Sequence, residues 1–291
     1  MRAVVELLLT NNCQRECRYC LAQTEDSSYT TVQGKINERG DYKLAGGIMN
    51  TEQLKRWLAF QKKYLPDVRL VISGGEPTIV RHYTELLEWI HNAGFAKPIL
   101  YTNGLNIKDL ANMDNPKDKV KVILTHHQTS DIARTKEYVR FLKDMEIGFI
   151  VKVLADKPVE KPDLGCKVVV EGIIKQYSKN IEEKMRQMQE HPPALDGSSP
   201  YKWRWNGHRD FIDWEWTAWK ESLVFTVFPA GHVINCHFWN DKPCGNIYEL
   251  KNILEGGNLQ IAWCHPFNGG VADEAVTRCE LLHYVNIMEE I

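Results

Sequence analysis

The stretch Val4-Val5-Glu6-Leu7-Leu8-Leu9-Thr10-Asn11-Asn12-Cys13-Gln14-Arg15-Glu16-Cys17-Arg18-Tyr19-Cys20 decides the fold expected for this chain. Its apolar run, followed by three polar residues, predicts a buried strand that ends in a loop. The loop carries three cysteines in the pattern C-x3-C-x2-C. Cysteine thiolates are the preferred ligands of iron–sulfur clusters. Three of them can hold three irons of a four-iron cubane and leave the fourth iron open, as a catalytic cluster requires.

The cysteine spacing, together with Tyr19 before the third cysteine, resembles the cluster motif of radical S-adenosylmethionine (SAM) enzymes. The resemblance implies that Cys13, Cys17 and Cys20 hold a 4Fe–4S cluster whose open iron is chelated by the methionine part of SAM. It also implies that Tyr19 lies at the cofactor. A zinc loop and three unrelated core cysteines are the alternatives, although zinc loops more often combine C-x2-C with a second, distant pair.

A second motif, Gly74-Gly75-Glu76-Pro77, follows the predicted strand 68–73. Two glycines let the backbone approach a ligand closely, and Glu76 adds an acceptor beside them. Taken alone, such a tetrad predicts only a tight turn. It resembles the GGEP motif of radical SAM enzymes, which implies that residues 74–77 receive the SAM amino group. We therefore expect a side chain at Gly75 to weaken SAM binding while the cluster still assembles.

Strands and helical patterns alternate along the first two thirds of the chain. This alternation predicts an α/β fold with a parallel sheet. The resemblance implies the partial, six-stranded (β/α)6 TIM-type barrel of radical SAM enzymes. The connection 155–166 contains Pro158 and Pro162 and is too short and broken for a helix, so the fifth helix is expected to be missing. The further strands are expected at 97–102, 120–124, 148–154 and 167–171, and the helices at 50–64, 79–93 and 130–146.

Candidate cofactor residues follow the ends of these strands. Barrel active sites lie at the carboxyl ends of the strands. The resemblance implies that Thr102 and Asn103 contact the SAM ribose. Thr125 and Lys152 are candidates to hold the SAM carboxylate or an anionic group of the substrate, Lys152 as a point charge.

Two adjacent histidines, His126 and His127, are candidate catalytic residues at the end of the fourth strand. Side chains alternate along a strand, so only one of the two can point inward if the strand extends that far. Histidine changes charge near neutral pH, so the inward one could move a proton during the reaction. In the alternative interpretation, both histidines cap the following helix or face solvent.

The sequence divides into a barrel over 1–190, a linker over 191–200 and a smaller domain over 201–291. In the last part, Leu223–Phe228 and His232–Ile234 flank Pro229-Ala230-Gly231, which predicts a β-hairpin. Gly231-x4-Cys236, with Gly245-Asn246-Ile247 downstream, resembles the SPASM/twitch extensions of radical SAM enzymes. This C-terminal β-hairpin/helix domain would then bind an auxiliary cluster.

The resemblance implies a second 4Fe–4S cluster on the four cysteines of this part. The match is partial, because the family's cysteine before the glycine and its C-x2-C-x5-C-x3-C run are absent. Scattered core cysteines, or zinc held with His237 or His265, are the alternatives. The four cysteines are Cys236, Cys244, Cys264 and Cys279.

Composition excludes several classes of protein. The formal net charge of −2 over 291 residues provides no strongly basic patch for a nucleic-acid backbone. The sequence contains no apolar run of transmembrane length and no signal peptide, which predicts a cytoplasmic protein without a membrane partner. In that compartment eight cysteines indicate metal ligands rather than disulfides.

The resemblance implies reductive cleavage of SAM to a 5′-deoxyadenosyl radical, which abstracts hydrogen from a substrate carbon. The enzyme would be an oxidoreductase or an isomerase and would take electrons from a donor such as flavodoxin or ferredoxin. Its expected substrate is a peptide, an amino-acid derivative or another small molecule. A leader-peptide-binding domain is not expected, because the first strand begins almost at Met1.

Two alternatives for the function remain at this point. The first is radical modification of a nucleotide or an amino-acid-decorated nucleic-acid base, as in hypermodified DNA. Bases could then stack on the tryptophans at 203, 205, 214, 216 and 219. The second is an iron–sulfur or zinc protein without catalysis, although such a protein would not need the tetrad at 74–77.

Overall fold

The computed structural model describes residues 2–15, 47–62, 67–127, 130–155, 161–172, 222–234, 245–247, 288–289 and 291. Several predicted features lie outside these residues and stay predictions. They are the linker 191–200 and the site residues Cys17, Tyr19, Cys20, Cys236, Cys244, Cys264 and Cys279.

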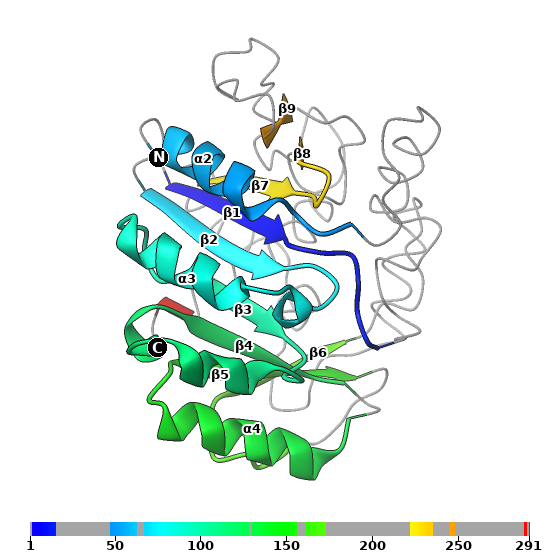
Figure 1. Ribbon diagram of the computed structural model, residues 1–291. Helices are drawn as coiled ribbons and strands as arrows, with labels where there is room; N and C mark the ends of the chain where they lie inside the picture. Colours follow the sequence, from blue (N-terminus) through cyan, green and yellow to red (C-terminus); the bar gives the residue numbers. More distant parts are fainter. Residues whose placement is uncertain are drawn as a thin grey trace, which may run out of the picture.

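The described strands form one sheet, in the order β6-β5-β4-β3-β2-β1-β7-β8-β9 (Figure 1). Strands β1 to β6 pair with their neighbours in parallel, and β7 pairs in parallel with β1. Strand β8 pairs antiparallel with β7 and with β9. The predicted α/β fold with its parallel, barrel-type sheet is confirmed. The bounds are β1 Arg2–Leu8, β2 Asp67–Ser73, β3 Ile99–Thr102, β4 Lys121–His126, β5 Phe149–Ala155, β6 Val168–Gly172, β7 Ser222–Val227, β8 His232–Ile234 and β9 Gly245–Asn246.

Three described α-helices connect the parallel strands and cover one face of the sheet (Figure 1). They are α2 (Thr51–Gln61), α3 (Tyr83–Asn92) and α4 (Ile132–Asp144). No helix lies within residues 161–167, the described part of the connection between β5 and β6. Three short 3-10 helices complete the loops: η2 (Pro77–Ile79), η3 (Ile107–Asn112) and η4 (Pro116–Asp118).

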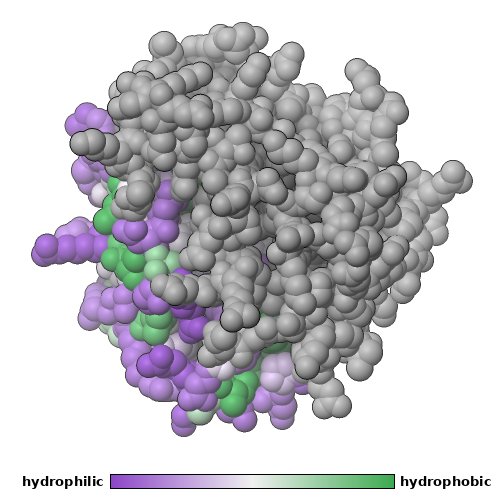
Figure 2. Space-filling view, turned by 90° about the vertical axis from the view of Figure 1, so that its right-hand side faces the viewer, coloured by the Kyte–Doolittle hydropathy of each residue, from purple (hydrophilic) through white to green (hydrophobic). Residues whose placement is uncertain are grey.

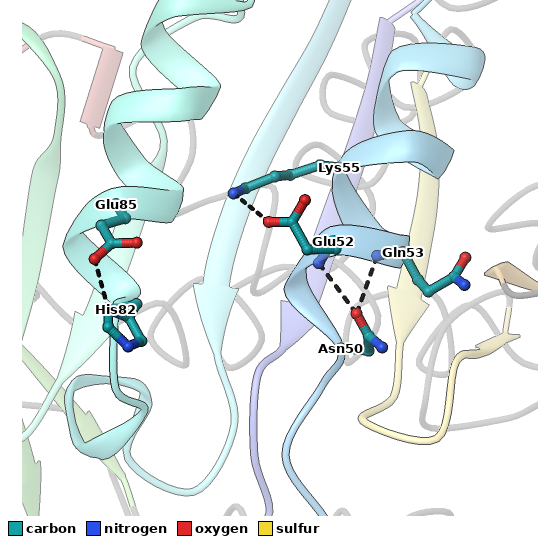
Figure 3. Close-up of polar contacts among 6 residues, drawn as sticks. All are labelled: Asn50, Glu52, Gln53, Lys55, His82 and Glu85. Carbon is teal, nitrogen blue, oxygen red and sulfur yellow. Dashed lines mark hydrogen bonds and ion pairs between the residues drawn. The ribbon is translucent and has the colours of Figure 1, made fainter.

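Figure 3 shows the residues at which α2 and α3 begin. The Asn50 side chain accepts hydrogen bonds from the backbone N–H groups of Glu52 and Gln53, both at 3.1 Å, so Asn50 is the N-cap of the helix predicted over 50–64. Helix α3 begins four residues later than predicted. Of its predicted first turn, 79–82, only Ile79 is helical, as the last residue of the 3-10 helix η2, and His82, in a left-handed conformation at φ 68°, directly precedes the helix.

The hydrophobic core lies between the helices and the sheet. Leu7 and Leu9, for example, pack there with Trp57 of α2 and Leu87 of α3. Because side chains alternate along a strand, the neighbouring positions belong to the opposite face of the sheet. That face carries more polar side chains than the helix-covered face, set among buried apolar ones such as Val71 and Ile123. It includes Glu6, Ser73, Tyr101, Thr125, Lys152 and Thr226.

Strand β7 extends the sheet beyond the six parallel strands that the sequence predicts. The predicted hairpin of β7 and β8 is confirmed, with Thr226 opposite Ile234. The other edge of β7 pairs in parallel with β1, from Arg2–Ser222 to Leu7–Val227. The apolar pattern of a strand predicts that it is buried but not which strand pairs with it, so this pairing was not predicted.

In Figure 2, the visible surface of the described residues is largely hydrophilic and includes small hydrophobic areas. Among the described helices, none has both the length and the apolar character needed to span a membrane.

Candidate active site

The chain after β1 and the chain after β2 remain hydrogen-bonded beyond the ends of the strands. The N–H of Gly75 donates to the carbonyl of Thr10 at 2.6 Å, and the N–H of Glu76 donates to the carbonyl of Asn12 at 2.8 Å. The parallel register of the two strands therefore continues into both loops. It places the tetrad 74–77 directly beside Cys13 at the carboxyl edge of the sheet, where the two predicted motifs meet.

The glycines of the tetrad are required by this backbone contact. A Cβ at Gly75 would lie 2.1 Å from the carbonyl oxygen of Asn12, and one at Gly74 would lie 2.4 Å from that of Thr10. Gly74 also has φ +128°, which side chains disfavour. The clash of such a Cβ falls on the residue before Cys13, so a side chain at Gly75 is expected to disturb the cluster loop as well as SAM binding.

Glu76 is buried, with 1% of its surface exposed, and its carboxylate joins the ends of β2 and β3. Its Oε1 accepts from the Thr78 hydroxyl at 2.6 Å and N–H at 3.1 Å, and from the Thr102 hydroxyl at 2.7 Å. Its Oε2 accepts from the N–H of Asn103 at 2.7 Å. Burial raises the pKa of Glu76 above its usual range, and these hydrogen bonds oppose the rise. The carboxylate thus serves as an internal acceptor.

Replacing Glu76 tests this cross-strand role. In Glu76→Gln, the amide oxygen can keep the three bonds of Oε1, but the NH2 group would face the N–H of Asn103. We expect a loss of about 1–3 kcal/mol in the free energy of unfolding, because a buried donor loses its acceptor. Urea denaturation measures it, with the exposed Glu85→Gln as the control. A loss no larger than that of the control would contradict the role.

Cys13 is exposed and lies at this edge, and two N–H groups point to its sulfur. The backbone N–H of Arg15 donates to Sγ at 3.4 Å, and the Asn103 side-chain Nδ2 donates to Sγ at 3.8 Å. Asn103 therefore contacts a predicted cluster ligand. The hydroxyl of Thr102 donates to the Glu76 carboxylate and accepts from the backbone N–H of Gly104 at 3.0 Å.

The two histidines lie on different sides of β4. His126 Nδ1 is 2.7 Å from the hydroxyl of Thr135 in α4, on the helix-covered side, and burial and then the charge of Arg15 lower the pKa of His126. His127 is placed where burial, and then the charges of Arg15 and Lys152, lower its pKa from 6.5 to about 4. The imidazole is neutral at pH 7, which corrects the expectation that the inward histidine titrates near neutrality.

Lys152 and Thr125 are neighbours on the polar face of the sheet. The register of β4 and β5 places them opposite each other. The Lys152 ammonium also lies 5.7 Å from the centre of the Tyr101 ring, a cation–π distance. Lys152 and Arg15, the latter in the loop that carries Cys13, both act electrostatically on the His127 imidazole.

Sequence reasoning missed three polar residues here. The Oδ1 of Asn11 and the Nε of Arg15 are buried without a hydrogen-bond partner in the described part of the chain. Glu6, buried on β1, accepts from Ser73 at 2.7 Å and from Thr226 at 3.1 Å. The only signal for Glu6 was one acidic residue inside the apolar run, and Arg15 was visible only as a cation within the cysteine motif.

The described residues include Cys13 and Cys166 among the eight cysteines. Within them, no three His, Cys, Asp or Glu side chains form a group that could hold a metal. A solvent-accessible thiol that accepts two N–H···S bonds is nevertheless suited to a cluster thiolate, since such bonds stabilise negative charge on sulfur. Cys13 therefore fits the predicted 4Fe–4S site.

Comparison with known proteins supports an iron–sulfur site in the first half of the chain. Residues 2–140 match the family described as "4Fe-4S single cluster domain". Over 103 residues, 35% of this chain, the sequence is 28% identical to 7,8-dihydro-6-hydroxymethylpterin dimethyltransferase of Methanocaldococcus jannaschii. The match spans only 17% of that relative's length.

Solved structures share the fold at low sequence identity. Streptococcus suis SuiB bound to its precursor peptide SuiA aligns over 99% of this chain and 73% of its own, with a TM-score of 0.53 and 13% identity. SuiB has also been solved bound to S-adenosylmethionine. The structure of anSMEcpe with bound AdoMet aligns over 85% of this chain and 78% of its own, with a TM-score of 0.51 and 14% identity.

Proposed function

We propose that this chain is a radical SAM enzyme, which cleaves SAM reductively and uses the resulting 5′-deoxyadenosyl radical to abstract hydrogen from a substrate carbon. The observation that carries the proposal is the contact between the Cys13 loop, the tetrad 74–77 and Asn103. When bound, a 4Fe–4S cluster supplies one electron to the sulfonium of SAM, whose C5′–S bond breaks to give methionine and the radical.

The residues around Cys13 fit the methionine part of SAM. An amine needs an acceptor and a carboxylate needs a cation, and the buried Asn11 Oδ1 and Arg15 Nε offer one of each. Lys152 adds a second cation on the polar face, and Thr125 a hydroxyl opposite it. The protein's part is to hold SAM and the substrate carbon in contact and to keep water out.

We propose a peptide or an amino-acid derivative as the substrate. Support comes from SuiB, whose structure holds a precursor peptide and aligns with nearly all of this chain. The reaction is an oxidation if the product radical loses an electron and an isomerisation if it does not. An auxiliary cluster on Cys236, Cys244, Cys264 and Cys279 could accept that electron. Flavodoxin or ferredoxin in the cytoplasm would supply the first one.

Anaerobic reconstitution tests the proposal. We expect the full chain, supplied with iron, sulfide, dithionite and SAM, to release 5′-deoxyadenosine, which mass spectrometry detects. Zinc in place of iron, or a reduced cluster that never cleaves SAM, would instead favour a binding protein without catalysis. Candidate peptides added to the same assay would reveal the substrate by a mass change.

His127 predicts a pH dependence of stability. Its pKa is about 4 in the folded chain, against the ordinary histidine value of 6.5 in the unfolded chain, so the unfolded chain binds more protons between these values. Stability is therefore lost as pH falls below 6.5. For this residue we expect a loss of about 2 kcal/mol between pH 7 and pH 5. In urea denaturation, the stability of the wild type relative to His127→Gln should fall by this amount as the pH is lowered from 7 to 5. The exposed His91→Gln is the control, and a difference that does not change with pH would contradict the assignment.

A further inference from the structure

The amide of Asn103 is held in one orientation by two neighbours. Its Oδ1 accepts from the backbone N–H of Leu105 at 3.1 Å, which identifies the oxygen and directs the NH2 group away from Leu105. Its own backbone N–H is bound by the buried carboxylate of Glu76 at 2.7 Å. Asn103 itself is 7% exposed. The side chain is therefore fixed before any cofactor binds.

The fixed NH2 group points to Cys13. Its Nδ2 lies 3.8 Å from Sγ, a contact between residues 90 positions apart in the sequence. A second donor to this sulfur, the N–H of Arg15, is local and belongs to the loop itself. Asn103 is thus the donor that connects the Cys13 sulfur to the rigid end of β3.

We propose that Asn103 is a positioning residue for the cluster ligand Cys13: its amide donates an N–H···S hydrogen bond that orients the thiolate and raises the reduction potential of the cluster. The inference rests on the proposed function, because Cys13 must be a ligand. An N–H donor stabilises negative charge on a cluster sulfur, and the reduced cluster carries more of that charge. The bond therefore favours the state that transfers the electron to SAM.

Asn103→Asp is the sharpest variant. Asp has the same shape and keeps the Oδ1 that accepts from Leu105, but it replaces the NH2 donor with an acceptor. Asn103→Ala removes the donor without adding charge. The control is Asn92→Asp. It makes the same chemical change at an exposed residue, the last of α3, where the helix has returned to the opposite edge of the sheet.

The readout is the midpoint potential of the reconstituted cluster, followed by electron paramagnetic resonance in a reductive titration without SAM. We expect Asn103→Asp to make reduction at least about tenfold less favourable, a shift of about 59 mV to lower potential for one electron. Asn103→Ala should shift it in the same direction by less, and Asn92→Asp should not shift it.

Each possible result either supports or overturns the inference. Potentials of both Asn103 variants equal to that of Asn92→Asp would overturn the inference and leave the proposed function standing. Loss of iron from both variants, with an unchanged thermal melting curve, would support the contact with Cys13. A wild-type chain that forms no cluster would overturn the proposed function and this inference with it. If the Asn103 variants lose thermal stability but keep the wild-type midpoint potential, Asn103 has only a structural role and the inference is overturned.

Discussion

Cys13→Ala is expected to abolish release of 5′-deoxyadenosine, by more than about 100-fold. Loss of a residue that only supports a metal ligand already costs about 10–100-fold in metal affinity, and Cys13 would be a ligand itself. The thiol lies beside the tetrad 74–77, so its loss removes the anchor of the cluster at the point where SAM must bind. Iron content, the visible absorption of the cluster and mass spectrometry measure the effect.

Cys166→Ala is the matched control, because Cys166 is the other described cysteine. It precedes β6, at the amino edge of the sheet, and packs against the hydrophobic core. We expect this change to cost about 1 kcal/mol of stability or less, since the side chain is small and only partly buried, and to leave SAM cleavage intact. Equal behaviour of the two variants would remove Cys13 from the proposed site.

Gly75→Ala is expected to be severe for so small a change. Its Cβ would lie 2.1 Å from the carbonyl oxygen of Asn12 and 2.9 Å from the carbonyl carbon of Asn11. These are backbone atoms of the chain that leads to Cys13, so they cannot move without moving the cluster loop. We expect a loss of about 3 kcal/mol or more in the free energy of unfolding, together with reduced iron loading and SAM binding.

Gly148→Ala provides the comparison. A Cβ there would meet the Cγ2 methyl of the exposed Ile291 at 3.2 Å and no other atom of the described residues closer than 3.7 Å, so a small shift of one side chain relieves the contact. Urea denaturation and iron analysis of the two variants should differ strongly. A Gly75→Ala protein that loads iron as fully as Gly148→Ala would show that the tetrad and the cluster loop are not coupled.

Local patterns in the sequence were sufficient for most of the fold. The N-cap at Asn50, the hairpin of β7 and β8, and the order of strands and helices follow from the residues within each segment. Hydrophobic periodicity and capping are short-range properties, so one segment carries its own information. The predicted start of α3 was wrong, because no local sequence signal indicates the left-handed conformation of His82.

The sequence by itself determined the two motifs, their place at the ends of β1 and β2, and the chemistry that their residue types can support. Only the tertiary structure decided what touches what: Glu76 joins β3, Asn103 contacts Cys13, His126 faces α4, and β7 pairs with β1. The physical reason is that these contacts depend on the register between strands far apart in the chain. That register is a result of packing the whole sheet, which no single segment encodes.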